Sequence, residues 1–177
     1  KYTWKLEDMV AEDSQWEQMF KEAAGEISEY ASYKGRLADS ADTLYACLSF
    51  DDRLSQKIER LYVYARMRSD EDTTVQRYQD MFSRVQTLSY RAAENSSFLV
   101  PEILSMDREL LDRYMETDNG ISHFKRALEI ILARRDHTLS AEMEELLAQS
   151  YDATQGASQI FTMFNNADVK FPVITGE

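Results

Sequence analysis

The stretch Leu54-Ser-Gln-Lys-Ile-Glu-Arg-Leu-Tyr-Val-Tyr-Ala65 and the turn Asp70-Glu-Asp-Thr-Thr74 decide the fold of this 177-residue chain. Apolar side chains recur every three or four positions from Leu54 to Ala65, which is the period of one helix face. A second such stripe occupies 74–95, with Val75, Tyr78, Phe82, Val85, Leu88 and Ala92. Two helices of about twenty residues joined by a short turn predict a long antiparallel hairpin.

Helix signals continue toward the N-terminus. Ser14-Gln-Trp-Glu17 has the pattern of a capping box, in which a hydroxyl and a carboxylate bind free amides at a helix start. Gly35 suits the left-handed position that ends this helix. Ser40 can cap the next one, which either continues through Asp51-Asp52 into the hairpin or ends there.

Helices are also expected after the hairpin. Pro101 can occupy the first position of a short helix, Asp107 can cap another, and Gly120 marks a stop. Further helices are predicted to about residue 166. The acidic residues of 70–72 suit the start of the helix predicted at 74–95. The tail Val169-Lys-Phe-Pro-Val-Ile-Thr175 favours a strand, and its pairing partner is expected beyond residue 177. The sequence therefore predicts an all-α antiparallel helical bundle with a long hairpin and one short terminal strand.

Composition narrows the function classes. Only 5 Gly and 2 Pro argue against an all-β sandwich. A formal net charge of −12 repels phosphates and anionic headgroups, so neither nucleic acid nor a membrane is expected as a partner. Cys47 is the single cysteine, which rules out an internal disulfide and favours a reducing, cytoplasmic location. We interpret Cys47 as a core residue on the stripe of Leu44 and Leu48.

No motif for bond-making chemistry emerges. His123 and His137 lack a His or Cys at helical-neighbour spacing, which argues against zinc. Asp70-Glu71-Asp72 lacks the Gly and closing Glu of a calcium loop. Neighbouring carboxylates such as Glu22 and Glu26 are interpreted as a solvated helix face. The many tyrosines favour core and rim packing, with lining of a peptide groove as the alternative.

Seven segments, in order and nearly from end to end, resemble the oligoendopeptidase F family of thimet-type zinc metallopeptidases. Each is weakly specific alone, and together they carry the assignment. They are Tyr2-Thr-Trp-Lys-Leu-Glu-Asp8 with Trp16, Tyr33-Lys-Gly35 with Leu37, Leu61-Tyr-Val-Tyr-Ala65, Asp70-Glu-Asp-Thr73, Ser97-Phe98 with Pro101-Glu-Ile-Leu104, His137-Thr-Leu-Ser140, and Asn166-Ala-Asp168 with Phe171-Pro172.

The resemblance implies a non-catalytic N-terminal helical lobe at 1–168, with 169–177 beginning the crossover into a catalytic domain. The family cleaves short peptides with a His-Glu-x-x-His helix and a later Glu that bind zinc, and none of these residues is present here. No catalytic or metal-binding residue is therefore assigned, and zinc is expected in the parent enzyme only. The lobe would form one wall of the substrate channel.

The same resemblance suggests partners and contact residues. The partners are the catalytic domain of the full-length protein and short peptides, and an isolated fragment could dimerise through an uncovered apolar face. Tyr62 and Tyr64 are the candidate channel-lining residues. Asn165, Asp168 and Phe171 are the candidate interdomain contacts. The alternatives are a stand-alone acidic helical protein-interaction module without enzymatic activity and a paralogue that never had a catalytic half.

Overall fold

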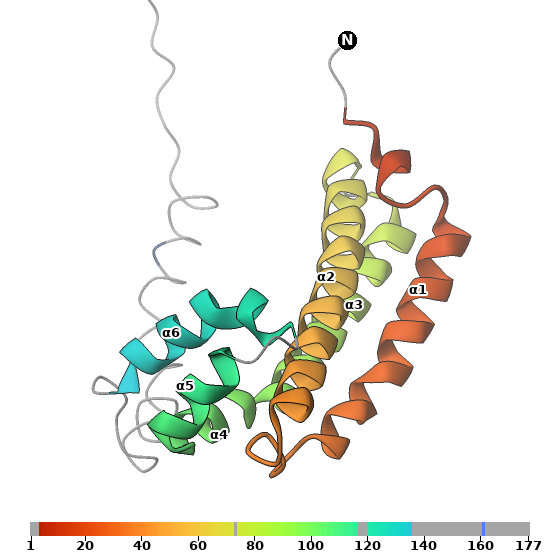
Figure 1. The fold of residues 1–177 in the computed structure, drawn as a ribbon. Helices are drawn as coiled ribbons and strands as arrows, with labels where there is room; N and C mark the ends of the chain where they lie inside the picture. The colour runs from red at the N-terminus through yellow and green to blue at the C-terminus, as the bar shows by residue number, and fades with distance from the viewer. Residues whose placement is uncertain (1–3, 73, 117–119, 136–160, 162–177) are drawn as a thin grey trace, which may run out of the picture. The chain divides into compact units, whose positions relative to one another are not determined.

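The computed structural model describes residues 4–72, 74–116, 120–135 and 161. The chain divides into two units, 1–133 and 134–177, and the fold below is that of the first unit. Its described elements are all helical (Figure 1), as the all-α prediction requires. The predicted helices after residue 135 and the terminal strand lie outside the described residues. The elements are the 3-10 helices η1 (Leu6–Asp8), η2 (Ile27–Ser32) and η3 (Ile121–Phe124), and the α-helices α1 (Asp13–Glu26), α2 (Ala41–Glu71), α3 (Gln76–Ser96), α4 (Leu99–Ser105), α5 (Arg108–Glu116) and α6 (Lys125–Ala133).

Helices α2 and α3 form the predicted hairpin. The Ser40 hydroxyl accepts a hydrogen bond from the Thr43 amide at 3.1 Å, which confirms the cap. Helix α2 then runs unbroken for 31 residues through Asp51-Asp52, because it contains no glycine or proline. Asp72 has extended backbone and accepts a bond from the Thr74 amide at 2.9 Å, so it shapes the turn. The prediction that the acidic residues of 70–72 begin the next helix was wrong, because the first turn of α3 contains no acidic residue.

Helix α1 begins two residues earlier than the capping box predicted. Its first residue is Asp13, and the cap position is held by Glu12, which has extended backbone. Ser14 donates its hydroxyl proton to the Glu12 carboxylate at 2.5 Å. Glu17 binds both terminal nitrogens of Arg84, each at 2.7 Å. The capping-box prediction was therefore wrong, because both of its side chains have other partners.

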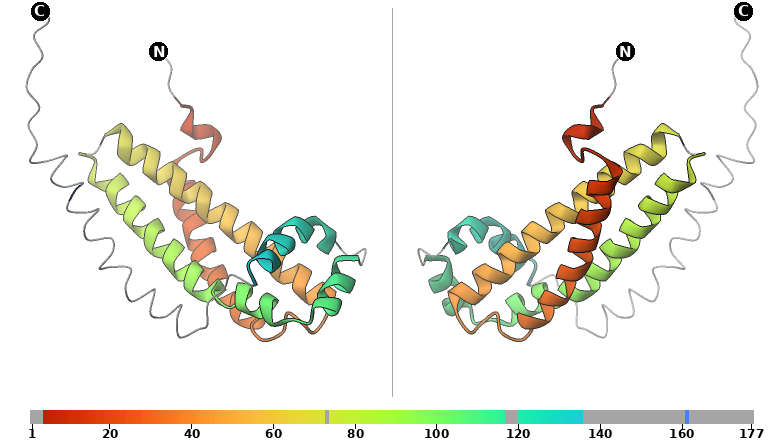
Figure 2. Two further views of the ribbon diagram at one scale, coloured as in Figure 1. Left: turned by 90° about the vertical axis from the view of Figure 1, so that its left-hand side faces the viewer. Right: turned by 90° about the vertical axis from the view of Figure 1, so that its right-hand side faces the viewer.

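Trp16 and Arg84 are among the side chains that attach α1 to the hairpin. Trp16 is fully buried and donates its indole N–H to the carbonyl of Leu61 in α2 at 2.9 Å. The Arg84 guanidinium of α3 lies 4.5 Å from the Phe20 ring centre and 5.2 Å from that of Trp16. One arginine thus combines a bidentate ion pair with two cation–π contacts. Figures 1 and 2 show the three long helices side by side.

Helices α4, α5 and α6 gather at the N-terminal end of α2 (Figure 2). Pro101 is the third residue of α4, not the first as predicted. It is tolerated because the first backbone bond of α4 is donated by Glu102, to the carbonyl of Phe98. Asp107 caps α5 as predicted and accepts a bond from the Leu110 amide at 3.0 Å. Gly120 caps the start of η3 with a φ of 89°.

One core of buried apolar side chains joins these helices. Cys47 belongs to it with no exposed surface, as predicted. Burial raises the pKa of its thiol to about 12, so the thiolate is rare near neutral pH. The largest buried side chains are Trp16, Tyr30, Tyr64, Phe50, Leu37, Leu44, Leu54, Leu61, Met81, Leu88, Ile103 and Leu111.

Candidate peptide-facing groove

A groove runs between the two helices of the hairpin, and we call it the hairpin groove. Its residues recur at spacings of three and four, so each helix presents one face to it. Short side chains form the α3 side, which leaves the space open. The lining residues are Tyr30, Asp51, Ser55, Ile58, Glu59, Tyr62, Ser89, Ala92, Ala93 and Ser96.

Tyr62, one of the two candidate channel-lining residues, lines this groove. Its side chain is 37% exposed. The ring meets Phe82 of α3 edge-on, with centroids 5.2 Å apart. The Arg66 guanidinium lies 5.1 Å from the centre of the same Phe82 ring. Tyr62 is therefore held in place by packing on one side and open on the other, and its contact with a peptide stays a prediction.

Tyr64 lies in the core. It is 1% exposed, and its hydroxyl donates to the Asp13 carboxylate at 2.9 Å. The Arg68 guanidinium lies 5.3 Å from the ring centre. Burial raises the pKa of the phenol. Tyr64 thus packs α2 against the start of α1 and presents almost no ring surface to a ligand.

Tyr30 lines the groove where α2 and α3 approach η2. It is 2% exposed and donates its hydroxyl proton to the Asp51 carboxylate at 2.6 Å. Burial raises the pKa of the Tyr30 phenol, and the bond to Asp51 adds to this rise. The Phe50 ring meets it edge-on at 4.9 Å. The hydroxyl of Tyr30 and one oxygen of Asp51 are therefore already occupied.

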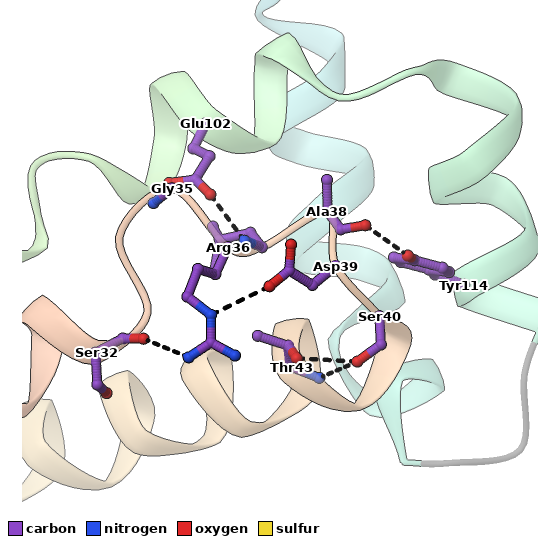
Figure 3. Close-up of polar contacts among 10 residues, drawn as sticks. Ser32, Gly35, Arg36, Ala38, Asp39, Ser40, Thr43, Glu102 and Tyr114 are labelled. Atoms are coloured by element: carbon purple, nitrogen blue, oxygen red, sulfur yellow. Dashed lines mark hydrogen bonds and ion pairs between the residues drawn. The ribbon is translucent and has the colours of Figure 1, made fainter.

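A second ordered feature is the loop 33–40, which joins η2 to α2 (Figure 3). The Glu102 carboxylate of α4 accepts the Gly35 amide on one oxygen and the Leu37 amide on the other, each at 2.8 Å. The Tyr114 hydroxyl of α5 donates to the carbonyl of Ala38 at 2.9 Å. Gly35 has a φ of 78°, which confirms the predicted left-handed conformation, but it does not end α1, because α1 ends at Glu26 and η2 follows to Ser32. Two later helices thus fix the backbone of this loop.

Sequence reasoning missed these clamps. Glu102 stands in the sequence only within one of the segments that resemble the family, and no sequence pattern singled out Tyr114. Their partners are backbone groups 65 to 76 residues away, so no local pattern marks them. Arg84 was missed for the same reason, since its partner Glu17 is 67 residues away.

The described residues offer little chemistry for metal binding. They contain no group of three or more His, Cys, Asp or Glu side chains that could hold an ion. The His123 ring packs edge-on against Phe124 at 5.5 Å. The His, Cys, Asp and Glu side chains of the described residues therefore do not match the zinc ligands that the resemblance implies for the parent enzyme. His137 and the candidate interdomain residues Asn165, Asp168 and Phe171 lie outside the described residues, as do the carboxylates after residue 135.

Hydropathy gives one further observation. None of the helices described here combines the length and the apolar character needed for a membrane span.

Known proteins resemble this chain over nearly all of its length. The family profile described as Oligopeptidase F matches residues 102–171. Oligopeptidase PepF of Bacillus subtilis (strain 168) is 38% identical over 99% of this chain and 26% of its own. The chromosomal oligoendopeptidase F of Lactococcus lactis subsp. cremoris is 34% identical over 99% of this chain and 29% of its own.

Two crystal structures share the fold. Oligoendopeptidase F from Enterococcus faecium has a TM-score of 0.71 and 30% identity, covering 93% of this chain and 32% of its own. A protein from Chlamydophila abortus, at 19% identity and a TM-score of 0.70, supports the fold alone. The chain spans about a quarter to a third of the length of the relatives it matches. This chain therefore belongs to the oligopeptidase F family and corresponds to the N-terminal region of its members.

Proposed function

We propose that this chain is the non-catalytic lobe of a zinc oligopeptidase and forms one wall of its peptide channel. Zinc would be bound by residues of the catalytic domain, outside this chain. The partners are that domain and short peptides, and the location is the cytoplasm. Neither nucleic acid nor a membrane is a partner. A homodimer of the isolated chain stays a prediction.

The observation that carries this proposal is the hairpin groove with Tyr62 in it. A channel wall needs an accessible surface on rigid elements, because orientation is lost when the supporting backbone moves. The groove lies between helices of 31 and 21 residues, and each of them is held to α1, α2 through Trp16 and α3 through Arg84. The Tyr62 ring adds a half-exposed aromatic surface with a polar tip.

The chain's own residues would bind and orient the peptide. Aromatic and small side chains exclude water from one side of an extended backbone, while the Tyr62 hydroxyl can bond a peptide carbonyl or amide. Zinc supplies an activated water in enzymes of this kind. Because the described residues contain no cluster of three or more side chains that could bind zinc, no chemical step is assigned to them.

The test uses the full-length protein and a quenched fluorescent octapeptide. We expect Tyr62→Ala to raise KM about threefold to tenfold with kcat nearly unchanged, because an aromatic contact made equally in the ground and transition states affects binding alone. Zinc content should not change. The 177-residue chain alone should neither cleave the peptide nor bind zinc stoichiometrically.

Tyr45→Ala is the matched control. Tyr45 lies in the same helix with the same 37% exposure, but its ring faces Phe124 at 6.1 Å and lies outside the groove. KM should stay near its original value in this variant. Equal KM values for the Tyr62→Ala, Tyr45→Ala and unchanged proteins would refute a channel wall at the hairpin groove. Peptide cleavage by the 177-residue chain would refute the non-catalytic role.

A further inference from the structure

The hairpin groove carries charge of one sign. Its lining contains two carboxylates, Asp51 and Glu59, and no Lys, Arg or His. Asp51 already accepts the Tyr30 hydroxyl at 2.6 Å. Glu59 is exposed, and its carboxylate forms no hydrogen bond or ion pair with any side chain that the structure describes. The groove therefore presents one carboxylate whose charge is not compensated locally.

Two cations of α2, Lys57 and Arg66, have partners other than Glu59. Arg66, one turn beyond Tyr62, pairs with Asp70 at 2.9 Å and lies over the Phe82 ring. Lys57 pairs with Glu26 at 2.6 Å. Neither the Lys57 ammonium nor the Arg66 guanidinium pairs with Glu59.

The Tyr62 ring completes a surface for a cation. Residues three apart share a helix face, so Glu59 and Tyr62 are neighbours along the groove. A carboxylate beside an exposed aromatic ring is a combination that attracts ammonium and guanidinium groups. Across the groove, Ser89, Ala92 and Ala93 of α3 have short side chains, which permit close approach by a peptide backbone.

We propose that Glu59 and Tyr62 form a subsite that selects peptides carrying a positively charged group in this groove. The proposal rests on the proposed function, in which the hairpin groove faces the substrate. The occupant is a cationic nitrogen of a short peptide, either a Lys or Arg side chain or the free amino terminus. Charge complementarity supports this choice, since the uncompensated group is anionic and the whole chain carries −12.

The experiment measures kcat/KM of the full-length protein on a set of quenched fluorescent octapeptides. In the first series, each peptide is acetylated at its N-terminus and a single Lys moves through the sequence. The second series has norleucine in place of Lys. A third peptide has norleucine and a free amino terminus, so that the two sources of positive charge are separated.

We expect Glu59→Gln to lower kcat/KM about threefold for the charged peptide that reaches the subsite, as for an exposed ion pair, and to leave norleucine peptides unchanged. Glu59→Lys should reverse the preference. Added salt should weaken the preference of the original protein, because solvent ions screen an exposed pair. Asp80→Asn is the matched control. It removes an exposed carboxylate of α3 that is not part of the groove lining and that accepts a hydrogen bond from the Gln76 side chain.

The outcomes separate the two proposals. If Tyr62→Ala raises KM for every peptide while Glu59→Gln changes no ratio of charged to neutral peptide, the channel wall stands and the charge selection is refuted. If neither variant changes KM for any peptide, the groove does not face substrate and both proposals fail. An equal effect of Asp80→Asn would refute a local subsite, because net charge alone would then explain the preference.

Discussion

At the scale of single residues, three glycines differ in what an added methyl group would meet. Gly25 lies inside α1 with open space around its position. Gly35 has a φ of 78° and also faces open space. Gly120 has a φ of 89°, and a Cβ there would stand 2.8 Å from two ring carbons of Tyr45. The three sites therefore separate helix propensity, backbone strain and steric contact.

We expect alanine to change the free energy of unfolding differently at each glycine. Gly25→Ala should raise it by about 1 kcal/mol through helix propensity. Gly35→Ala should lower it by about 1 kcal/mol, because a left-handed conformation disfavours a side chain. Gly120→Ala should lower it further, since the Tyr45 ring must move away from the added methyl group. Urea unfolding curves measure all three.

Tyr45→Ala provides the control for the steric contribution. In that background, Gly120→Ala should cost no more than Gly35→Ala, because the ring that the methyl group meets is absent. An excess cost that persists without the Tyr45 ring would contradict the steric explanation and leave backbone strain alone.

At the scale of elements, the Glu102 clamp makes the loop 33–40 depend on α4. Each carboxylate oxygen accepts one backbone amide. A glutamine has only one accepting oxygen and places an NH₂ donor against the other amide. We expect Glu102→Gln and Glu102→Ala each to lower the free energy of unfolding by about 1.5–3 kcal/mol, the range for hydrogen bonds to a charged group. Thermal unfolding and the rate of proteolysis within 33–40 are the measurements.

Glu94→Gln is the matched control, because Glu94 is an exposed acid at the end of α3. Its effect should stay within about 0.5 kcal/mol, as for an ordinary surface substitution. If Glu102→Gln is as stable as Glu94→Gln, the loop does not depend on the charged clamp.

The same elements show which parts of the fold could be predicted from sequence. The caps at Ser40 and Asp107 and the left-handed Gly35 are local, because each acts on backbone within a few residues. The start of α1 is not local, since Glu17 binds Arg84 across 67 residues. Stripes of apolar residues predict a helix face, but they do not give the register of one helix against another.

The candidate groove shows the same division. Tyr62 and Tyr64 were both candidate channel-lining residues, and Tyr62 lies at the groove while Tyr64 is in the core. The buried face of α2 contains Tyr64 and Ser69 together with Leu54, Ile58, Leu61 and Ala65. Stricter use of the helical period could therefore have separated Tyr64 from Tyr62. The pairing of Tyr62 with Phe82 depends on the register of the hairpin, for which the sequence carries no signal.

At the scale of the whole molecule, stability should fall as the pH rises on the alkaline side. The pKa values of Tyr30, Tyr33, Tyr64 and Cys47 are all raised, in each case chiefly by burial. A raised folded-state pKa gives stability that is fully present below the unfolded pKa and is lost as pH rises through the folded one. The unfolded values are about 9 for the thiol and 10 for the phenols, so the loss should begin there.

Urea unfolding at pH 8, 9.5 and 11 tests this expectation, with the free energy of unfolding falling at each step. Each group that ionises only in the unfolded chain contributes about 1.4 kcal/mol per pH unit to the fall. Tyr30→Phe should be less stable at pH 8, because Asp51 loses the bond from the Tyr30 hydroxyl. Its free energy should nevertheless fall less steeply above pH 10, since the variant lacks one buried phenol. Equal slopes for Tyr30→Phe and the original chain would mean that general repulsion among the excess negative charges, and not the buried phenol, drives alkaline unfolding.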